Sequence, residues 1–297
     1  MSTRRKFFQT AGVLGLGVGI VAGGDRKVIA AGTSGLGAGA AAGEARAAGA
    51  AVIPTALKLG IAGYTWLHVP MDQSIAMMKW LAIDAFSIKD FYLPLDSDAA
   101  KVSEVVGVFS AAGIRIYGAG VIYMKSQPEV DRAFAYAKLL GVELIIGVPN
   151  PELLSYVEQK VKETGIRVAV HNHGPEDKLY PSPADVWGRI KGLDERIGLC
   201  LDIGHAARAG ADPVKAVKEY GARIFDLHVK DLAVLSRDYH PAVLGRGVLD
   251  IPGLLRVLKE RRYSGYCSIE FEMDMNDPYP GIAESVGYFR GVLNGEG

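Results

Sequence analysis

The amino-acid sequence predicts one α/β domain, a closed barrel of eight parallel strands surrounded by helices. From residue 57 onward, short apolar or β-branched runs alternate with amphipathic segments of roughly ten to fifteen residues, which is typical of repeated βα units. The alternation occurs eight times in about 240 residues, the size of a single (β/α)8 barrel. A doubly wound open sheet would need a phosphate-binding glycine-rich turn after its first strand. Residues 60–63, GIAG, provide no such turn, so the barrel is the expected fold.

Strands are expected where apolar and β-branched residues run without interruption. Their ranges are 59–64, 85–88, 115–118, 144–148, 167–171, 198–202, 224–229 and 266–270. Helices are expected where apolar residues recur at three- and four-residue spacing, and Gly113, Gly141 and Gly165 are expected to end three of them. Their ranges are 74–81, 99–111, 129–140, 151–162, 183–190, 213–220, 252–261 and 281–293. Several begin near a proline, whose missing N–H group costs nothing in the first turn.

The N-terminal residues differ in composition from the rest of the chain. Arg4 and Arg5 are followed two positions on by Phe7, and residues 12–24 form an apolar, glycine-rich stretch. This order resembles the twin-arginine export signal, and an ordinary flexible N-terminus that happens to hold two arginines is the alternative. The apolar stretch is too short and too rich in glycine for a comfortable membrane span.

Behind that stretch, residues 30–51 consist largely of alanine and glycine, which is typical of a flexible linker or a cleavage region. We therefore expect a signal and linker over residues 1–50 and a TIM barrel catalytic domain over residues 57–297. The protein is expected to be exported by the twin-arginine route to the periplasm or another extracytoplasmic compartment. No stable membrane span is expected in the mature protein.

The charge balance argues against large charged partners. The chain has 33 basic and 33 acidic residues, so it has no global field that would attract nucleic acid or anionic lipid. A small or neutral ligand fits this balance better. Cys200 and Cys267 are too few for a disulfide framework and lack the spacing of a zinc motif, so they are expected in the core.

Polar side chains stand at the ends of the last four expected strands, where barrel enzymes carry their catalytic groups. The segments are VHNHG at 170–174, LDIGH at 201–205, LHVKD at 227–231 and IEFE at 269–272. Two imidazoles and two carboxylates from these segments would suit Mn, Zn, Fe or Co better than Ca or Mg, and Mn, Co or Zn is the expected ion. The candidate ligands are His171, Asp202, His228 and Glu270. Taken singly, each has an ordinary alternative, because a histidine can be a surface group and a carboxylate can cap a helix.

Strand alternation assigns faces to the neighbours of these ligands. If Asp202 points into the barrel, so does Cys200. The same parity places Lys230 on the face of His228, and Ser268 and Glu272 on the face of Glu270. Cys267 should face outward.

The motifs L-D-x-G-H, H-x-K-D and I-E after Y-x-G resemble those of the xylose isomerase-like TIM barrels, the sugar phosphate isomerase/epimerase family. Here they stand at residues 201–205, 228–231, 263–265 and 269–270. The resemblance implies that Asp202, His228 and Glu270 bind a divalent metal ion. It further implies that Glu270 also moves a proton, and that His205 contacts the substrate.

The sequence departs from the family pattern at two places. The family usually has a glutamate at the end of the fifth strand, where this chain has His171, so a second base would have to be His171 or His173. Arg246 stands between two glycines where an acidic residue is common, and it could bind a substrate oxygen or lie in a surface turn. Lys89, at the end of the second expected strand, could reach the barrel mouth or be solvated.

These features predict a metal-dependent sugar isomerase or epimerase that acts by enolisation next to a carbonyl, with Glu270 as the base. Lys230 is the first candidate acid and His173 the second, although Lys230 could instead pair with Asp231 or a neighbouring carboxylate. A lyase acting on keto-sugar glycosides is the alternative reaction, because elimination requires one base and one acid. A non-catalytic exported sugar-binding barrel is the alternative without chemistry. Metal-dependent abasic-site endonucleases share this barrel but need a basic groove, which the neutral charge disfavours.

Overall fold

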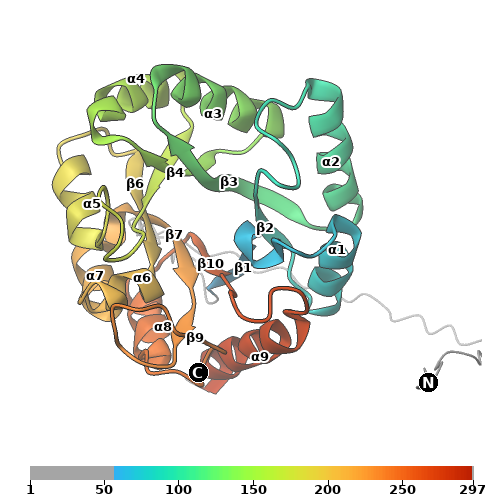
Figure 1. The fold of residues 1–297 in the computed structure, drawn as a ribbon, viewed down its shortest axis with the longest axis vertical. Coiled ribbons are helices and arrows are strands. Elements are labelled where there is room, and N and C mark those ends of the chain that lie inside the picture. Colours follow the sequence, from blue (N-terminus) through green and yellow to red (C-terminus); the bar gives the residue numbers. More distant parts are fainter. Residues whose placement is uncertain (1–56, 296–297) are drawn as a thin grey trace, which may run out of the picture. The chain divides into compact units, whose positions relative to one another are not determined.

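The computed structural model describes residues 57–295, which form a closed barrel of eight parallel strands with helices on its outside (Figure 1). Around the barrel the strands follow the order β1-β10-β7-β6-β5-β4-β3-β2. Their bounds are Lys58–Ala62 (β1), Ala85–Ile88 (β2), Arg115–Met124 (β3), Leu144–Pro149 (β4), Arg167–His171 (β5), Ile197–Asp202 (β6), Ile224–Val229 (β7) and Tyr266–Ile269 (β10). The fold is therefore the single (β/α)8 TIM barrel that the sequence predicts.

The helices begin and end at residues with the expected capping chemistry. The α-helices are Met71–Trp80 (α1), Ala99–Ala111 (α2), Gln127–Leu140 (α3), Leu154–Thr164 (α4), Pro183–Ile190 (α5), Ile203–Arg208 (α6), Pro213–Tyr220 (α7), Ile251–Glu260 (α8) and Tyr279–Gly295 (α9). Asp98, Asp212 and Asp250 accept backbone N–H groups at the starts of α2, α7 and α8. Gly141 and Gly165 adopt left-handed conformations directly after α3 and α4, as predicted for helix-ending glycines.

The barrel separates two buried regions. Between strands and helices lies the main apolar core, which includes Cys267. Inside the barrel lies a smaller cluster that includes Cys200 and Tyr117. The two cysteines thus lie on opposite sides of the barrel wall, as strand alternation predicts, and both thiols are buried and free.

The structure departs most from the predicted elements at three places. β3 continues to Met124, six residues beyond its expected end at 118, and Gly120 permits this because a Cβ atom there would lie 2.2 Å from the carbonyl oxygen of Ile146. The short helix α6 follows β6 directly, where a loop is expected. Residues after β7 form a two-stranded antiparallel sheet of Asp231–Leu232 (β8) and Pro241–Ala242 (β9).

The predicted signal and linker, residues 1–50, lie outside the described residues. Between residues 57 and 295, no helix combines the length and the hydropathy that crossing a membrane requires.

Candidate metal centre and active site

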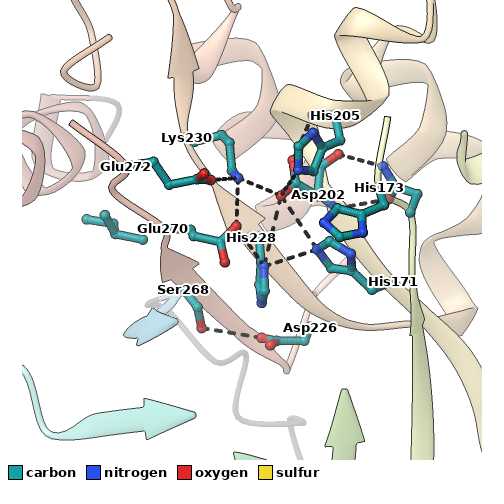
Figure 2. Close-up of polar contacts among 12 residues, drawn as sticks. His171, His173, Asp202, His205, Asp226, His228, Lys230, Ser268, Glu270 and Glu272 are labelled. Carbon is teal, nitrogen blue, oxygen red and sulfur yellow. Dashed lines mark hydrogen bonds and ion pairs between the residues drawn. The ribbon is translucent and has the colours of Figure 1, made fainter. Parts of the chain in front are cut away.

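The four candidate metal ligands meet at the C-terminal ends of four barrel strands. His171 and Asp202 are the last residues of β5 and β6, His228 lies one residue before the end of β7, and Glu270 follows β10. In the parallel register, Asp202 is paired with His228, so their side chains leave the sheet side by side. Figure 2 shows all four side chains pointing toward one another.

The distances between these ligand atoms are short. His171 Nε2 lies 3.2 Å from His228 Nδ1, and His228 Nδ1 lies 3.1 Å from Glu270 Oε2. Asp202 Oδ2 is 3.6 Å from His171 Nε2 and 4.0 Å from His228 Nδ1. One ligand atom from each of the four residues lies within 4.8 Å of the others. Ligands at about 2.0–2.2 Å from a common ion lie roughly 3.0–3.6 Å apart, so the cluster fits one divalent ion.

The protonation of His171 suits a ligand. Burial lowers the pKa of His171 to about 4, so its imidazole is neutral at pH 7 and offers a lone pair. Burial disfavours the charged form of Asp202, yet the positive charges around it, that of Lys230 among them, hold its pKa well below the usual value. The donor set therefore combines a neutral imidazole with an ionised carboxylate.

The two carboxylate oxygens of Asp202 have different functions. Oδ1 accepts the backbone N–H of His205 at 2.8 Å and caps α6, whereas Oδ2 faces the cluster of ligands. The end of β6 is further fixed by Asn172, whose side-chain amide makes two 3.0 Å hydrogen bonds with the backbone of Asp202. Asp202 therefore both caps α6 and belongs to the cluster of candidate metal ligands.

Lys230 lies beside the metal cluster and is buried. Its Nζ is 3.0 Å from Asp202 Oδ2 and 2.6 Å from Glu270 Oε2, and it also pairs with Glu272. Burial opposes its charge, but these three carboxylates raise the pKa of Lys230 well above its usual value. Lys230 thus pairs with neighbouring carboxylates, as one of the two sequence alternatives predicts, and it holds Glu270 in place.

The other alternative partner of Lys230, Asp231, has a separate function. Its carboxylate accepts the backbone N–H groups of Leu232, Gly245, Gly247 and Leu249. Asp231 therefore anchors the long segment that follows β7.

A cavity of about 300 Å³ opens above the cluster. Its lining residues are Tyr64, Lys89, Val121, Tyr123, His171, His173, His205, Glu270 and Glu272. The wall from β5, β6 and β10 supplies imidazoles and carboxylates, and the facing wall from the first three strands supplies two tyrosines and Lys89. A larger hollow of about 450 Å³ on the outside of the barrel, along α6 and α7, contains none of the predicted site residues.

The predicted site residues divide between this cavity and the surface. Lys89 donates to the carbonyl of Val121 at 2.9 Å and lies on the cavity wall. Arg246 instead donates to Glu284 through Nε and Nη2, and its side chain is 68% exposed and is not part of the cavity lining. The geometry therefore gives no support to Arg246 as a substrate contact.

Two of the cavity histidines have fixed orientations. His205 Nδ1 lies 3.2 Å from Arg208, and burial lowers the pKa of His205 to about 3, so it is neutral. His173 Nδ1 lies 2.7 Å from the hydroxyl of Tyr123, and the remaining nitrogen of His173 has no partner fixed by these contacts. The side chain of His173 is 35% exposed, so it is accessible to water.

Sequence reasoning missed several residues around the site. Tyr123 lies on the unexpected extension of β3, and Tyr239 belongs to the polar segment after β7, which gives no periodic signal. The Tyr239 ring covers Lys230, with Nζ 5.6 Å from the ring centroid. Arg208 contacts the same ring and pairs with Glu176.

Curated proteins are similar in sequence to part of this chain. Rhizopine catabolism protein MocC of Rhizobium meliloti is 30% identical over 142 residues, which cover 43% of this chain and 43% of that protein. An inosose dehydratase of Clostridium botulinum strain Eklund 17B is 30% identical over 151 residues, which cover 46% of this chain and 48% of that protein. The chain thus spans less than half of the length of these curated relatives.

The barrel also resembles solved structures. The crystal structure of IOLI protein with a bound zinc atom has a TM-score of 0.68 over 80% of this chain and 99% of that chain, at 17% identity, which is a likeness of fold. Residues 151–292 match the family model described as xylose isomerase-like TIM barrel. That segment contains all four candidate ligands and the last four barrel strands, so the match covers the part of the chain that builds the candidate site.

Proposed function

We propose that this protein is a divalent-metal-dependent enzyme that removes a proton next to the carbonyl of a sugar or a sugar-like polyol. The observation that carries the proposal is the convergence of four buried ligand atoms beside a cavity whose wall includes Glu270. His171, Asp202, His228 and Glu270 would hold the ion. When bound, such an ion polarises a substrate carbonyl and stabilises negative charge on its oxygen.

Glu270 is the base in this proposal. Burial disfavours its charge, but His228 and Lys230 lower the pKa of Glu270, so the carboxylate is ionised at neutral pH and can accept a proton. A carboxylate with a low pKa is a weak base, and the substrate proton must therefore be acidified by the neighbouring carbonyl. Lys230 keeps the carboxylate oriented through its 2.6 Å contact.

The arrangement favours elimination as the step after enolisation. Both carboxylates on the cavity wall, Glu270 and Glu272, follow the same strand, and His171 occupies the end of β5, where the family has a carboxylate. An epimerase needs a second base on the opposite face of the substrate, whereas a lyase needs an acid for the leaving group. His173, accessible to water and hydrogen-bonded to Tyr123, is the proposed acid; Lys230 is less suited because three carboxylates stabilise its charged form.

Elimination also agrees with the relatives. Those that share 22–30% identity over part of this chain include several inosose dehydratases. We therefore propose a lyase acting on keto-sugars or their glycosides as the first reaction. Isomerisation or epimerisation is the second, favoured by the family resemblance and by Tyr123, which lies on the facing wall with its hydroxyl 2.7 Å from His173 and could return a proton from that side.

The test is a screen of keto-sugars and their glycosides in heavy water with Mn, Co or Zn added. Enolisation predicts that the proton beside the carbonyl exchanges with solvent or is lost in an eliminated product. Elimination releases water or an aglycone, whereas isomerisation conserves the substrate mass. Glu270→Gln keeps an oxygen for the metal but no longer accepts a proton, so we expect turnover to fall about 10²–10⁴-fold.

Two outcomes would contradict the proposal. If an active enzyme kept the original hydrogen at that carbon in heavy water, the reaction would proceed by hydride transfer and not by enolisation. Saturable sugar binding without turnover in the presence of every metal tested would show that the barrel is a binding protein.

A further inference from the structure

A second polar cavity lies at the end of the barrel opposite the metal cluster. It has a volume of about 250 Å³, and Arg167, the first residue of β5, and Ile224, the first of β7, both line it. The strands are parallel and the metal ligands stand at their C-terminal ends. A ligand in this cavity therefore cannot reach the metal site.

The charge of this cavity is uncompensated. Its lining includes Arg167, Arg261 and Arg262, and among the described residues that form it none is acidic. Arg261 donates to the backbone carbonyl of Lys218, and the guanidinium carbon of Arg167 lies 4.9 Å from the centroid of the Phe225 ring. These partners are neutral, so they fix the positions of the cations without cancelling their charge.

Several other cations of the protein pair with carboxylates. Arg246 pairs with Glu284, Arg196 with Asp194, and Lys160 with Asp131. Against a net charge of zero for the whole chain, three arginines around one hollow form a local positive site. Lys58, which donates to the carbonyl of Ser264 on the cavity lining, adds a fourth cation with a neutral partner.

The backbone conformation of Arg262 is an independent indication that this cavity has a function. Arg262 follows α8 with φ 52°, a left-handed conformation in which glycine is the usual residue. Its N–H bonds to Lys259 and that of Tyr263 bonds to Leu258, which closes the helix in the manner normally made by glycine. The chain thus places a long cationic side chain where the backbone favours none.

We propose that this arginine cavity, defined by Arg167, Arg261 and Arg262, binds the phosphate group of a small phosphorylated molecule. Guanidinium groups present pairs of N–H donors that match the oxygens of phosphate, and several of them around one hollow suit a multiply charged anion better than a chloride ion. Ser264 and Gly265 add a hydroxyl group and a closely approaching backbone to the same lining.

The test uses pyrophosphate as the probe on the full chain after chelator treatment, so that the probe cannot bind an ion at the metal cluster. Calorimetry should give one site, and thermal melting should show a saturable rise in Tm beyond that of potassium chloride at equal ionic strength. Arg262→Gly should raise the Tm of the free protein, because it relieves the backbone, and should weaken pyrophosphate binding about tenfold or more. Arg261→Gln should weaken binding without raising the Tm.

Two control variants separate the cavity from general effects. Ala82→Gly changes the other left-handed residue that follows a helix, α1, with φ 49°, and should raise the Tm while leaving pyrophosphate affinity unchanged. Arg115→Gln removes a charge at the start of β3, outside the cavity lining, and should also leave the affinity unchanged. Equal affinity of Arg262→Gly and the unaltered protein, or equal weakening by Arg115→Gln, would overturn the proposal.

A further arm separates a free phosphate ester from a membrane headgroup. Co-sedimentation with phosphatidylglycerol vesicles that pyrophosphate does not displace would overturn the assignment to a small molecule. Absence of sedimentation together with pyrophosphate binding supports it.

Discussion

Gly204, the fourth residue of the LDIGH segment, is explained by its contact with Lys230. A Cβ atom at Gly204 would lie 2.6 Å from Cγ and 2.7 Å from Cδ of Lys230, in the middle of a side chain whose end is held by three carboxylates. The lack of a side chain at Gly204 therefore leaves the space that the Lys230 side chain needs to reach Glu270. The glycine of the LDIGH motif thus meets a steric requirement of the site.

Gly204→Ala should destabilise the protein by about 1–3 kcal/mol, because Lys230 cannot shift without losing its carboxylate partners. The measurement is urea unfolding. Gly188→Ala is the matched control, since Gly188 lies within α5 with open space around it and should gain about 0.5–1 kcal/mol from helix propensity. Equal stability of Gly204→Ala and the unaltered protein would contradict the assigned contact.

Acid should destabilise the metal-free protein through His171. Its pKa is lowered from 6.5 to about 4 by burial, so its neutral form contributes stability that is fully present above pH 6.5 and is lost as the pH falls toward 4. The contribution is about 3 kcal/mol. Carboxylates also titrate in this range, so the measurement compares the unfolding free energies of the unaltered protein and His171→Gln between pH 7 and 4. Parallel pH curves for the two proteins would contradict the lowered pKa.

At the scale of elements, one carboxylate, that of Asp231, makes four of the hydrogen bonds that hold the segment after β7. Asp231 accepts four backbone N–H groups from residues 232–249, and the Tyr239 side chain within this segment covers Lys230. The segment contains little regular structure beyond β8 and β9, so its position over the site depends on these hydrogen bonds.

Asp231→Asn should destabilise the fold by about 3 kcal/mol or more, because the amide turns a donor toward N–H groups that a carboxylate accepts. Limited proteolysis should become faster within residues 232–249. Asp238→Asn removes the same charge from an exposed position of the same segment and serves as the control. Proteolysis at equal rates in the two variants would show that Asp231 does not anchor the segment.

The elements that could be predicted from the sequence are those with a regular apolar period. The barrel strands and the helices with capped ends follow directly from that signal, and strand alternation placed Cys200 inside the barrel and Cys267 outside it. The extension of β3 was missed because Gly118 and Gly120 interrupt its apolar run, although their lack of a side chain is what allows close pairing with β4. Helix α6 was missed because six residues are too short for a periodic pattern.

The candidate site was predictable for a related reason. Parallel strands bring their C-terminal ends together, so four strand-end residues define one cluster without any knowledge of distances. Contacts that come from loops, such as the Arg208–Glu176 pair and the Tyr239 ring, depend on chain paths that no local pattern specifies. The exposed pair of Arg246 with Glu284 arises in the same way, since α9 supplies the glutamate.

At the scale of the whole molecule, we propose that the barrel functions outside the cytoplasm. The support is Arg4 and Arg5 with the apolar stretch behind them. The twin-arginine route carries folded proteins, so a metal taken up before export would travel with the chain. Replacing both arginines by lysine should leave folded protein in the cytoplasm, as measured by cell fractionation, whereas lysine at Arg26 and Arg46 together should not affect export. Normal export of the Arg4→Lys, Arg5→Lys variant would contradict the signal.

The account as a whole depends on a single metal ion at the ends of β5, β6, β7 and β10. Elemental analysis of purified protein, after loading with Mn, Co or Zn and removal of excess ion, measures this directly. We predict about one ion per chain in the unaltered protein, almost none in Asp202→Ala or His228→Ala, and an unchanged content in Arg246→Ala, whose side chain lies away from the cluster. Metal content that stays the same in both the Asp202→Ala and His228→Ala variants would contradict the site.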